Sequence, residues 1–296
     1  MTMQPEIAAQ NLPLRAPRRS SALSQFLGRP GGVVAVVLIA AMLAVAIAAP
    51  WIAPFDPNQQ FDDLQLSPAG VAGHLLGTDE LSRDILSRVL FGTRVSITAG
   101  FLSVAAGAMI GIVLGMLAGM FQRLADTIIM PVCDLLLAMP GILLGIVVVA
   151  VLGSGLLQVC IAIAVLNVPV FARLMRSAVL KEKELDYVRA SIVQGASTLR
   201  ILVRHILPNT ISVVITQLSA AVGQAVLIEA ALSFLGLGVQ APTASWGSML
   251  SNGRDYLSTS PFYALAPGLM LFVLVLGLNL FTDALQRVLN PTGPKG

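Results

Sequence analysis

Five long stretches of this 296-residue chain contain no charged side chain. They cover residues 30–55, 95–122, 135–172, 205–228 and 256–282. About 20 helical residues cross the roughly 30 Å of hydrocarbon in a bilayer, and each stretch is at least that long. Only 11% of all residues are charged, whereas a soluble domain has about 25%. The sequence therefore predicts a polytopic membrane protein and excludes an ordinary soluble enzyme.

The stretch 135–172 is too long for one helix, and its Gly153-Ser154-Gly155 segment indicates a break between two spans. The first apolar run, residues 33–49, could pass for a signal peptide, but it exceeds the roughly 7 to 15 residues of such a segment, which favours an uncleaved span. We expect an all-α membrane protein with six transmembrane helices, at residues 33–53, 95–120, 127–152, 156–176, 208–233 and 262–284.

The basic residues predict the orientation of these spans, because loops rich in Lys and Arg stay on the cytoplasmic side. If the N-terminus is inside, 14 of the 18 Lys and Arg residues lie on the inner side, and only Arg83, Arg88, Arg94 and Arg254 lie outside. Both termini are therefore expected in the cytoplasm. The expected organisation is a tail (1–30), a first span and long outer loop (31–94), a five-helix core (95–291) with a cytoplasmic loop (177–207), and a second tail (292–296).

Motifs for autonomous catalysis are missing from the sequence. None of the three lysines, Lys181, Lys183 and Lys295, follows a glycine as a phosphate-binding P-loop requires. Neither Cys133 nor Cys160 has a partner at metal-ligand spacing, and the same holds for His74 and His205. We expect no metal site, no cofactor in this chain and no enzymatic activity of its own.

Two acids interrupt the predicted spans, Asp134 and Glu229. A charge at the bilayer centre costs roughly 2.5–3.5 kcal/mol on insertion scales, so both are expected in the bundle interior or along a wet translocation path. A hydrogen-bonded structural acid is the alternative. Glycines at every fourth position from Gly107 to Gly119 predict a helix face that another backbone approaches closely, either within the chain or at a dimer seam.

The outer segment before the second span predicts an amphipathic surface helix. Thr78 is placed to cap it, Asp79 would lie in its first turn, and Leu81, Ile85 and Val89 recur at four-residue steps up to Gly92. A second outer segment, residues 236–260, contains Trp246, a residue type common at membrane interfaces.

The cytoplasmic loop 177–207 predicts two short helices joined at Gly195, with Ser197 as the cap of the second. Its basic residues, including Arg189, Arg200 and Arg204, are spaced among small ones. Such a loop is either a compact surface for a cytoplasmic partner or an ordinary solvated positive-inside loop.

Three segments together resemble one family. They are DYVRASIVQGASTLRILVRHILPN (186–209), HLLGTDELSRDILSRVLFGTRVS (74–96) and EAALSFLGLGVQAPTASWGSML (229–250). The first looks like the EAA loop of inner-membrane permeases of binding-protein-dependent ABC importers. All three, in their order along the chain, resemble the dipeptide/oligopeptide/nickel permeases, and specifically the subunit with the long first outer loop. Arg189 stands where the family usually has Glu, Ser191 where it has Ala, and Ser82 where it has Gly.

The resemblance implies the type I ABC importer permease fold and four kinds of partner. These are a second, homologous permease subunit, two cytoplasmic ATPase subunits that hold ATP and Mg, an extracytoplasmic binding protein, and the lipid of a bacterial inner membrane; no nucleic acid is implied. The ATPase-coupling residues that the resemblance implies are Arg189, Ala190, Ser191, Gly195, Ala196, Ser197, Leu207 and Pro208. The implied outer contacts with the binding protein are Thr78, Asp79, Arg83, Asp84 and Trp246.

We therefore expect a permease subunit that takes up short peptides in an ATP-driven importer. Nickel chelates and glutathione are alternative substrates for the same architecture. A secondary transporter driven by an ion gradient is the alternative from another class, motivated by Asp134 and Glu229, and a membrane scaffold without transport is a third.

Overall fold

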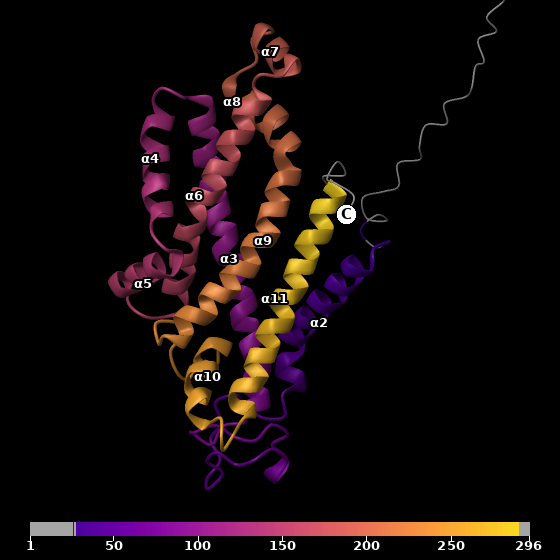
Figure 1. The fold of residues 1–296 in the computed structure, drawn as a ribbon, viewed down its shortest axis with the longest axis vertical. Coiled ribbons are helices and arrows are strands. Elements are labelled where there is room, and N and C mark those ends of the chain that lie inside the picture. Colours follow the sequence, from indigo (N-terminus) through magenta and orange to yellow (C-terminus); the bar gives the residue numbers. More distant parts are fainter. Residues whose placement is uncertain (1–25, 27, 290–296) are drawn as a thin grey trace, which may run out of the picture.

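The computed structural model describes residue 26 and residues 28–289, and within them all helices and turns form one elongated bundle (Figure 1). The expected tail 292–296 and nearly all of the tail 1–30 lie outside the described residues. Those residues contain no β-strand, only an isolated bridge between Thr78 and Asp84. The helices are α2 (Pro30–Ile52), α3 (Ile85–Met120), α4 (Ala125–Ala138), α5 (Gly141–Leu152), α6 (Leu156–Glu182), α7 (Asp186–Val193), α8 (Thr198–Ile201), α9 (Leu207–Phe234), α10 (Trp246–Gly253) and α11 (Phe262–Leu289).

Five helical stretches of the described chain are long and apolar enough to cross a membrane, and a bent pair makes a sixth. The predicted single helix over 127–152 is wrong, because α4 and α5 meet at an angle of 101°. Pro140 lies at this bend. Proline lacks a backbone N–H and disfavours helical geometry in the residue before it, which ends α4 at Ala138. The break expected at residues 153–155 is confirmed between α5 and α6.

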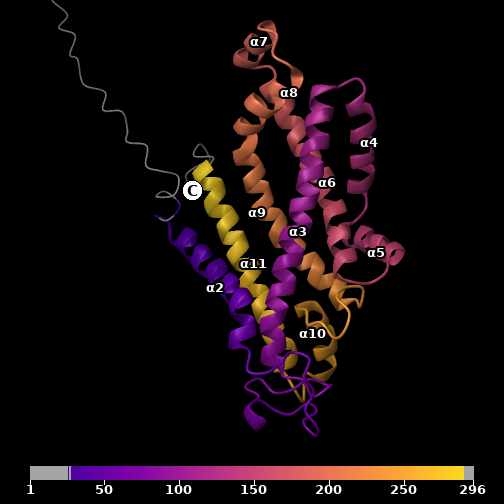
Figure 2. The ribbon, with the colours of Figure 1, turned by 180° about the vertical axis from the view of Figure 1, so that it is seen from behind.

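The two central helices, α3 and α6, pack closely along their length (Figure 2). The glycine face of α3 makes this possible. A Cβ at Gly111 would lie 2.8 Å from the Cβ of Phe171, and one at Gly115 would lie 2.8 Å from the Cβ of Met175. Neither position has room for a side chain. The predicted close approach of a second backbone is therefore confirmed, and it occurs within the chain.

The two ends of the bundle are built differently (Figure 1). At one end, α7 projects beyond the neighbouring helices; we call this the α7 end. At the other end, the irregular segment 53–84 lies with α10, and we call this the α10 end. The 14-residue α4 packs on α6 and α3, while α2 packs against α11 and α3. The central hydrophobic cluster includes Phe171, Val226, Leu232 and Trp246.

The predicted amphipathic helix from Thr78 to Gly92 is wrong. The helix begins at Ile85, runs without a break to Met120, and is capped by Asp84, which accepts a hydrogen bond from the Ser87 backbone N–H at 2.7 Å. The chain cannot be helical earlier, because Ser82 has φ +59° and the Asp79 carboxylate accepts the backbone N–H groups of Leu81 and Arg83. These contacts fold residues 79–83 into a tight turn.

Candidate functional site

The α7 end carries the loop whose sequence predicted a partner-binding surface. Helices α7 and α8 are joined through Gly195, which has φ +79°, a conformation that glycine adopts without strain. The Ser197 hydroxyl caps α8 by accepting the Arg200 backbone N–H at 3.4 Å. Both short helices and the cap agree with the prediction. We call residues 183–206 the α7–α8 loop.

A small hydrophobic cluster anchors this loop to the bundle. Val188 of α7 and Ile201 of α8 are buried, and they join Met175, Val179 and Ile206 in one cluster. Between α8 and α9, residues Leu202–Ile206 form a π-helical turn, and Pro208 follows in the first turn of α9. Because Pro208 donates no backbone hydrogen bond, a distorted turn before it costs little. The anchored side of the loop is therefore held in one orientation.

The opposite side of the loop exposes apolar side chains beyond the bundle. Val193 is 88% exposed and Leu199 is 71% exposed, and Ile192 and Val203 are also exposed. Of the predicted coupling residues, Arg189, Ala190, Gly195, Ser197 and Pro208 are exposed, while Ser191, Ala196 and Leu207 are half-buried. Apolar side chains gathered on a projecting surface are typical of a protein–protein interface.

Polar contacts in the α7–α8 loop lie at its surface. Arg189 pairs with Glu184 at 2.5 Å, with both side chains mostly exposed. The Tyr187 hydroxyl donates to Glu182 and accepts from Asn209 Nδ2 at 2.8 Å. Partial burial and the Glu182 carboxylate both raise the pKa of Tyr187, so its phenol stays neutral. These contacts orient α7 without burying charge.

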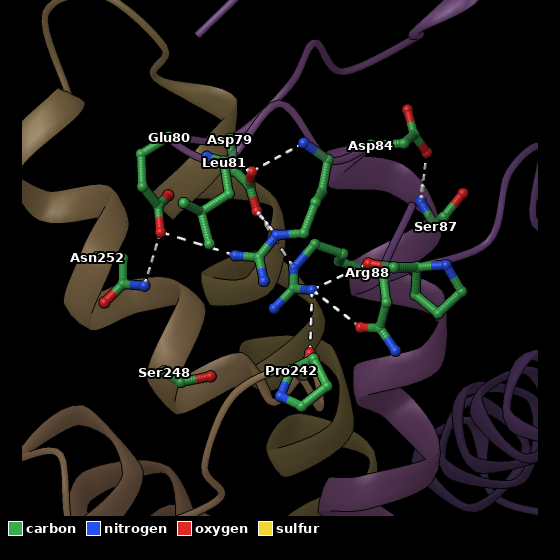
Figure 3. A network of polar contacts seen from close by, with 12 residues as sticks. Asp79, Glu80, Leu81, Asp84, Ser87, Arg88, Pro242, Ser248 and Asn252 are labelled. Carbon is green, nitrogen blue, oxygen red and sulfur yellow. Dashed lines mark hydrogen bonds and ion pairs between the residues drawn. The ribbon is translucent and has the colours of Figure 1, made fainter. Parts of the chain in front are cut away.

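Buried charges instead gather at the α10 end, in what we call the Asp79 network (Figure 3). Arg83 Nε donates to Asp79 Oδ2 at 2.7 Å, and Arg88 Nε lies 3.4 Å from the same oxygen. Arg88 Nη1 donates to the backbone carbonyls of Pro57 at 2.9 Å and Pro242 at 3.3 Å. The network thus ties segment 53–84 and the chain before α10 to the start of α3.

Burial raises the pKa of Asp79, while the backbone N–H of Arg83 and the two guanidinium groups act in the opposite direction. A second buried pair lies beside the network, where Asp84 Oδ1 contacts His74 Nδ1 at 2.9 Å. The His74 ring packs against Phe55 and Phe61 at centroid distances of 4.6 and 4.8 Å, and these two phenyl rings contact each other at 5.0 Å. The α10 end is therefore closed around polar groups that would be costly to bury without their partners.

The predicted outer contacts with a binding protein are contradicted by this burial. Thr78, Asp79, Arg83, Asp84 and Trp246 are all buried. The Thr78 hydroxyl donates to the Leu64 carbonyl and accepts the Ser67 N–H, and Trp246 Nε1 donates to the Val89 carbonyl at 3.0 Å. The prediction failed because polar residues in a loop suggested surface contacts, whereas these side chains satisfy one another and the backbone inside the fold.

The two intramembrane acids have different environments. Glu229 lies in the bundle interior with 0% exposure, where it accepts hydrogen bonds from Ser96 Oγ at 3.1 Å and Ser233 Oγ at 2.8 Å. Asp134 was also expected inside the bundle or on a wet path, but its side chain is 62% exposed on the surface of this chain and pairs with Arg173 at 2.6 Å. The packing of α6 against α4 places Arg173 beside Asp134.

Several residues of these sites were not identified from the sequence. Ser233 lies one helical turn from Glu229, a spacing that could have suggested the contact, but Ser96 is remote in sequence. The sequence identified Arg88 only as one of the four outer basic residues. No pattern in the sequence indicated a contact for Asn252, which donates to Glu80 Oε1 at 3.1 Å. Contacts of this kind depend on how distant segments pack.

Comparisons with known proteins agree with this arrangement. A family model for the binding-protein-dependent transport system inner membrane component matches residues 111–292, and one for the N-terminal transmembrane domain of oligopeptide transport permease C matches residues 19–69. The glutathione transport system permease protein GsiD of Pectobacterium atrosepticum is 43% identical over 267 residues, 90% of this chain and 89% of the relative. The di/tripeptide transport system permease protein DppC of Pseudomonas aeruginosa is 44% identical over 269 residues, 89% of this chain and 88% of the relative.

The fold also resembles a solved structure. A chain of the MetNI methionine ABC transporter, in an inward-facing conformation, superposes with a TM-score of 0.57 at 17% identity, covering 70% of this chain and 98% of that chain. This likeness shows the type I ABC importer permease fold. With a family model matching more than half of its length, the chain belongs to the family of binding-protein-dependent transport system inner membrane components.

Proposed function

We propose that this chain is the membrane-spanning permease subunit of an ATP-driven importer that takes up short peptides. The observation that carries the proposal is the similarity, at 43–44% identity over about nine-tenths of the chain, to permease proteins named for glutathione and for di- and tripeptides. In this function the chain supplies half of a passage through the lipid, and companion subunits supply the energy.

The proposed complex contains a second, homologous permease, two ATPases that hold ATP and Mg, and an extracytoplasmic binding protein. The α7 end would face the cytoplasm of a bacterium, with the chain in the inner membrane and both termini inside. Fourteen of the 18 basic residues then lie on the inner side. The exposed Val193 and Leu199 would enter a cleft of an ATPase.

The ATPase-coupling role proposed for the α7–α8 loop rests on its shape. A buried side, through Val188 and Ile201, transmits force to α6 and α9, while an exposed side offers the partner an apolar surface. Residues Arg189, Ser191, Gly195, Ser197 and Pro208 border that surface or shape it. The sequence contains no P-loop, which supports the proposal that ATP hydrolysis occurs in the partner.

Glutathione is the second candidate substrate, because a relative at 43% identity is named for it. The same architecture would serve both substrates. The ion-gradient alternative has less support. Asp134 is neutralised by Arg173 at the surface of the chain, and Glu229 is enclosed by two serine hydroxyls, so the two acids do not form one continuous relay.

Reconstitution tests the proposed function. The permease pair, both ATPases and the binding protein are placed in liposomes, and uptake of radiolabelled dialanine and glutathione is measured with and without ATP. We expect uptake of at least one of them only with ATP and the binding protein. Accumulation by the chain alone under an ion gradient, without nucleotide, would refute the proposal.

The variant Gly195→Asp supplies a control for coupling. We expect it to assemble in the membrane, because no atom lies within 4 Å of where its Cβ would be. The added carboxylate beside the exposed apolar side chains of the loop should disturb the contact with the ATPase and separate ATP hydrolysis from uptake. Normal uptake by this variant would remove the coupling role from the Gly195 junction.

A further inference from the structure

A polar cavity of about 220 Å³ lies beside the Asp79 network. It is lined by the turn before α3, the first turn of α3, the end of α9, the chain that follows α9, and α10. Among its lining residues are Glu80, Arg83, Arg88, Thr243, Ser248 and Ser251. Figure 3 shows Glu80 beside Asn252 of α10, with Ser248 of the same helix below them and Arg88 to their right.

The two guanidinium groups at this cavity have more donors than the protein has acceptors. Each carries five N–H donors, and both side chains are about 95% buried. Arg83 donates one side-chain hydrogen bond, to Asp79, and its Nη2 is 3.7 Å from Glu80 Oε1. Arg88 donates hydrogen bonds only through Nη1. Its buried Nε is 3.4 Å from Asp79 Oδ2 but makes no hydrogen bond of good geometry in the described part of the chain.

An acceptor on the same cavity is also unpaired. Glu80 Oε1 accepts from Asn252. The buried Oε2 makes no hydrogen bond of normal geometry with the described residues, although the buried Tyr263 phenol lies near the same carboxylate. Buried groups of this kind are rare, because each unmade hydrogen bond costs free energy. The cavity therefore presents donors that lack an acceptor next to an acceptor that lacks a donor.

We propose that this cavity binds the carboxylate of a short peptide during its passage. The guanidinium N–H groups of Arg83 and Arg88 would donate to the carboxylate, and Glu80 Oε2 would accept an N–H of the same molecule. Guanidinium groups suit this role, because they form charge-assisted hydrogen bonds with planar carboxylates. The inference rests on the proposed function, and it places a determinant of substrate recognition in the permease itself.

Binding of dialanine and its C-terminal amide tests the inference. The permease pair with its ATPases is placed in nanodiscs without nucleotide and without the binding protein, and binding is measured by calorimetry. We expect dialanine to bind at least about tenfold more tightly than the amide, because the amide lacks the charge that strengthens the hydrogen bonds. Equal binding of the two, or no binding of either, would overturn the inference.

A matched pair of variants tests the location without breaking the network. Ser251→Asp adds a carboxylate at the cavity wall, and Ser251→Asn adds an amide of the same shape. We expect the Asp variant to weaken dialanine binding at least about tenfold and to raise the melting temperature of the complex, because it supplies the missing acceptor. The Asn variant should do neither.

Two results would assign the cavity differently. If both Ser251 variants bind dialanine like the wild type, the peptide does not bind there. If Ser251→Asp blocks docking of the binding protein but leaves dialanine binding intact, the cavity accepts an acidic side chain of that protein. Either result overturns the inference. Neither bears on the proposed function, which is tested by ATP-dependent uptake by the wild-type importer.

Discussion

Both ends of the bundle contain ion pairs, but the pairs of one end are buried and that of the other is exposed. At the α10 end, Asp79, Arg83 and Arg88 are buried and connect segments far apart in sequence. At the α7 end, Arg189 and Glu184 pair across five residues at the surface. Removing one partner of a buried pair leaves an uncompensated charge, whereas an exposed pair contributes little.

The difference indicates separate roles for the two ends. The α10 end uses its polar groups to hold segment 53–84, α3 and the chain before α10 in one arrangement. The α7 end leaves its charges solvated and exposes Val193 and Leu199, which are suited to an interface with another protein. One end is stabilised from within, and the other presents a surface to a partner.

The largest effect is expected from Asp79→Ala. It removes the acceptor of Arg83 Nε and of two backbone N–H groups. It leaves Arg88 buried without its carboxylate, and Arg83 with only Glu80, 3.7 Å from its Nη2. We expect a loss of about 3–5 kcal/mol of stability, seen as a large fall in the melting temperature of the chain in nanodiscs.

Asp255→Ala is the matched control for that prediction. Asp255 also pairs with an arginine at this end, Arg254 at 3.4 Å, but its side chain is 71% exposed. Its removal should change stability by about 0.5 kcal/mol or less. Similar melting temperatures for the two variants would contradict the contrast between buried and exposed pairs.

Val193→Asp tests the α7 end and should have the next largest effect. The side chain is 88% exposed, so the fold should be unaffected. A charge placed in an apolar interface should weaken binding of the ATPase by about 2 kcal/mol, which is roughly thirtyfold. Titration of purified ATPase onto the permease pair measures this. Val193→Ile is the control, and equal binding by both variants would show that the ATPase binds elsewhere.

The features that the sequence predicted well are those set by local composition. Apolar length predicted the spans, the four-residue glycine step predicted the close packing of α3, and Gly195 with Ser197 predicted the two short helices. Each depends on residues within a few turns of one another. The resemblance supplied the family, which the comparisons confirm.

The wrong predictions have two causes: two residues that could each cap the same helix, and contacts between residues far apart in the sequence. Thr78 and Asp84 are both good helix caps, and only the turn around Asp79 shows why Asp84 begins α3. The contact between Ser96 and Glu229 spans 133 residues, and that between Arg88 and Pro242 spans 154. No periodicity reveals such pairs, so the outer residues were assigned to a surface although they are buried.

Substitutions at Gly195 are expected to have an intermediate effect on ATP-driven uptake. Its φ of +79° disfavours residues with a Cβ, by roughly 1–2 kcal/mol, although the space around it is open. Gly195→Val should therefore slow ATP-driven uptake severalfold at unchanged bundle stability, while Gly195→Asn should come closer to the wild type, because Asn tolerates this conformation. Equal uptake by the two variants would show that backbone conformation at the junction is unimportant.

The smallest effect is expected from the pair at the α7 end. Arg189 occupies the position where the resembling family usually has Glu, and its guanidinium pairs with Glu184 of the same loop. Since both side chains are solvated, a double-mutant cycle of Arg189→Ala and Glu184→Ala, followed by melting temperature, should give a coupling energy of about 0.5 kcal/mol or less. A coupling of several kcal/mol would mean that this pair is shielded from water in the folded chain. A small coupling in the isolated chain that grows when the ATPase is bound would show that the partner covers this surface, because excluding water strengthens the interaction between the same two charges.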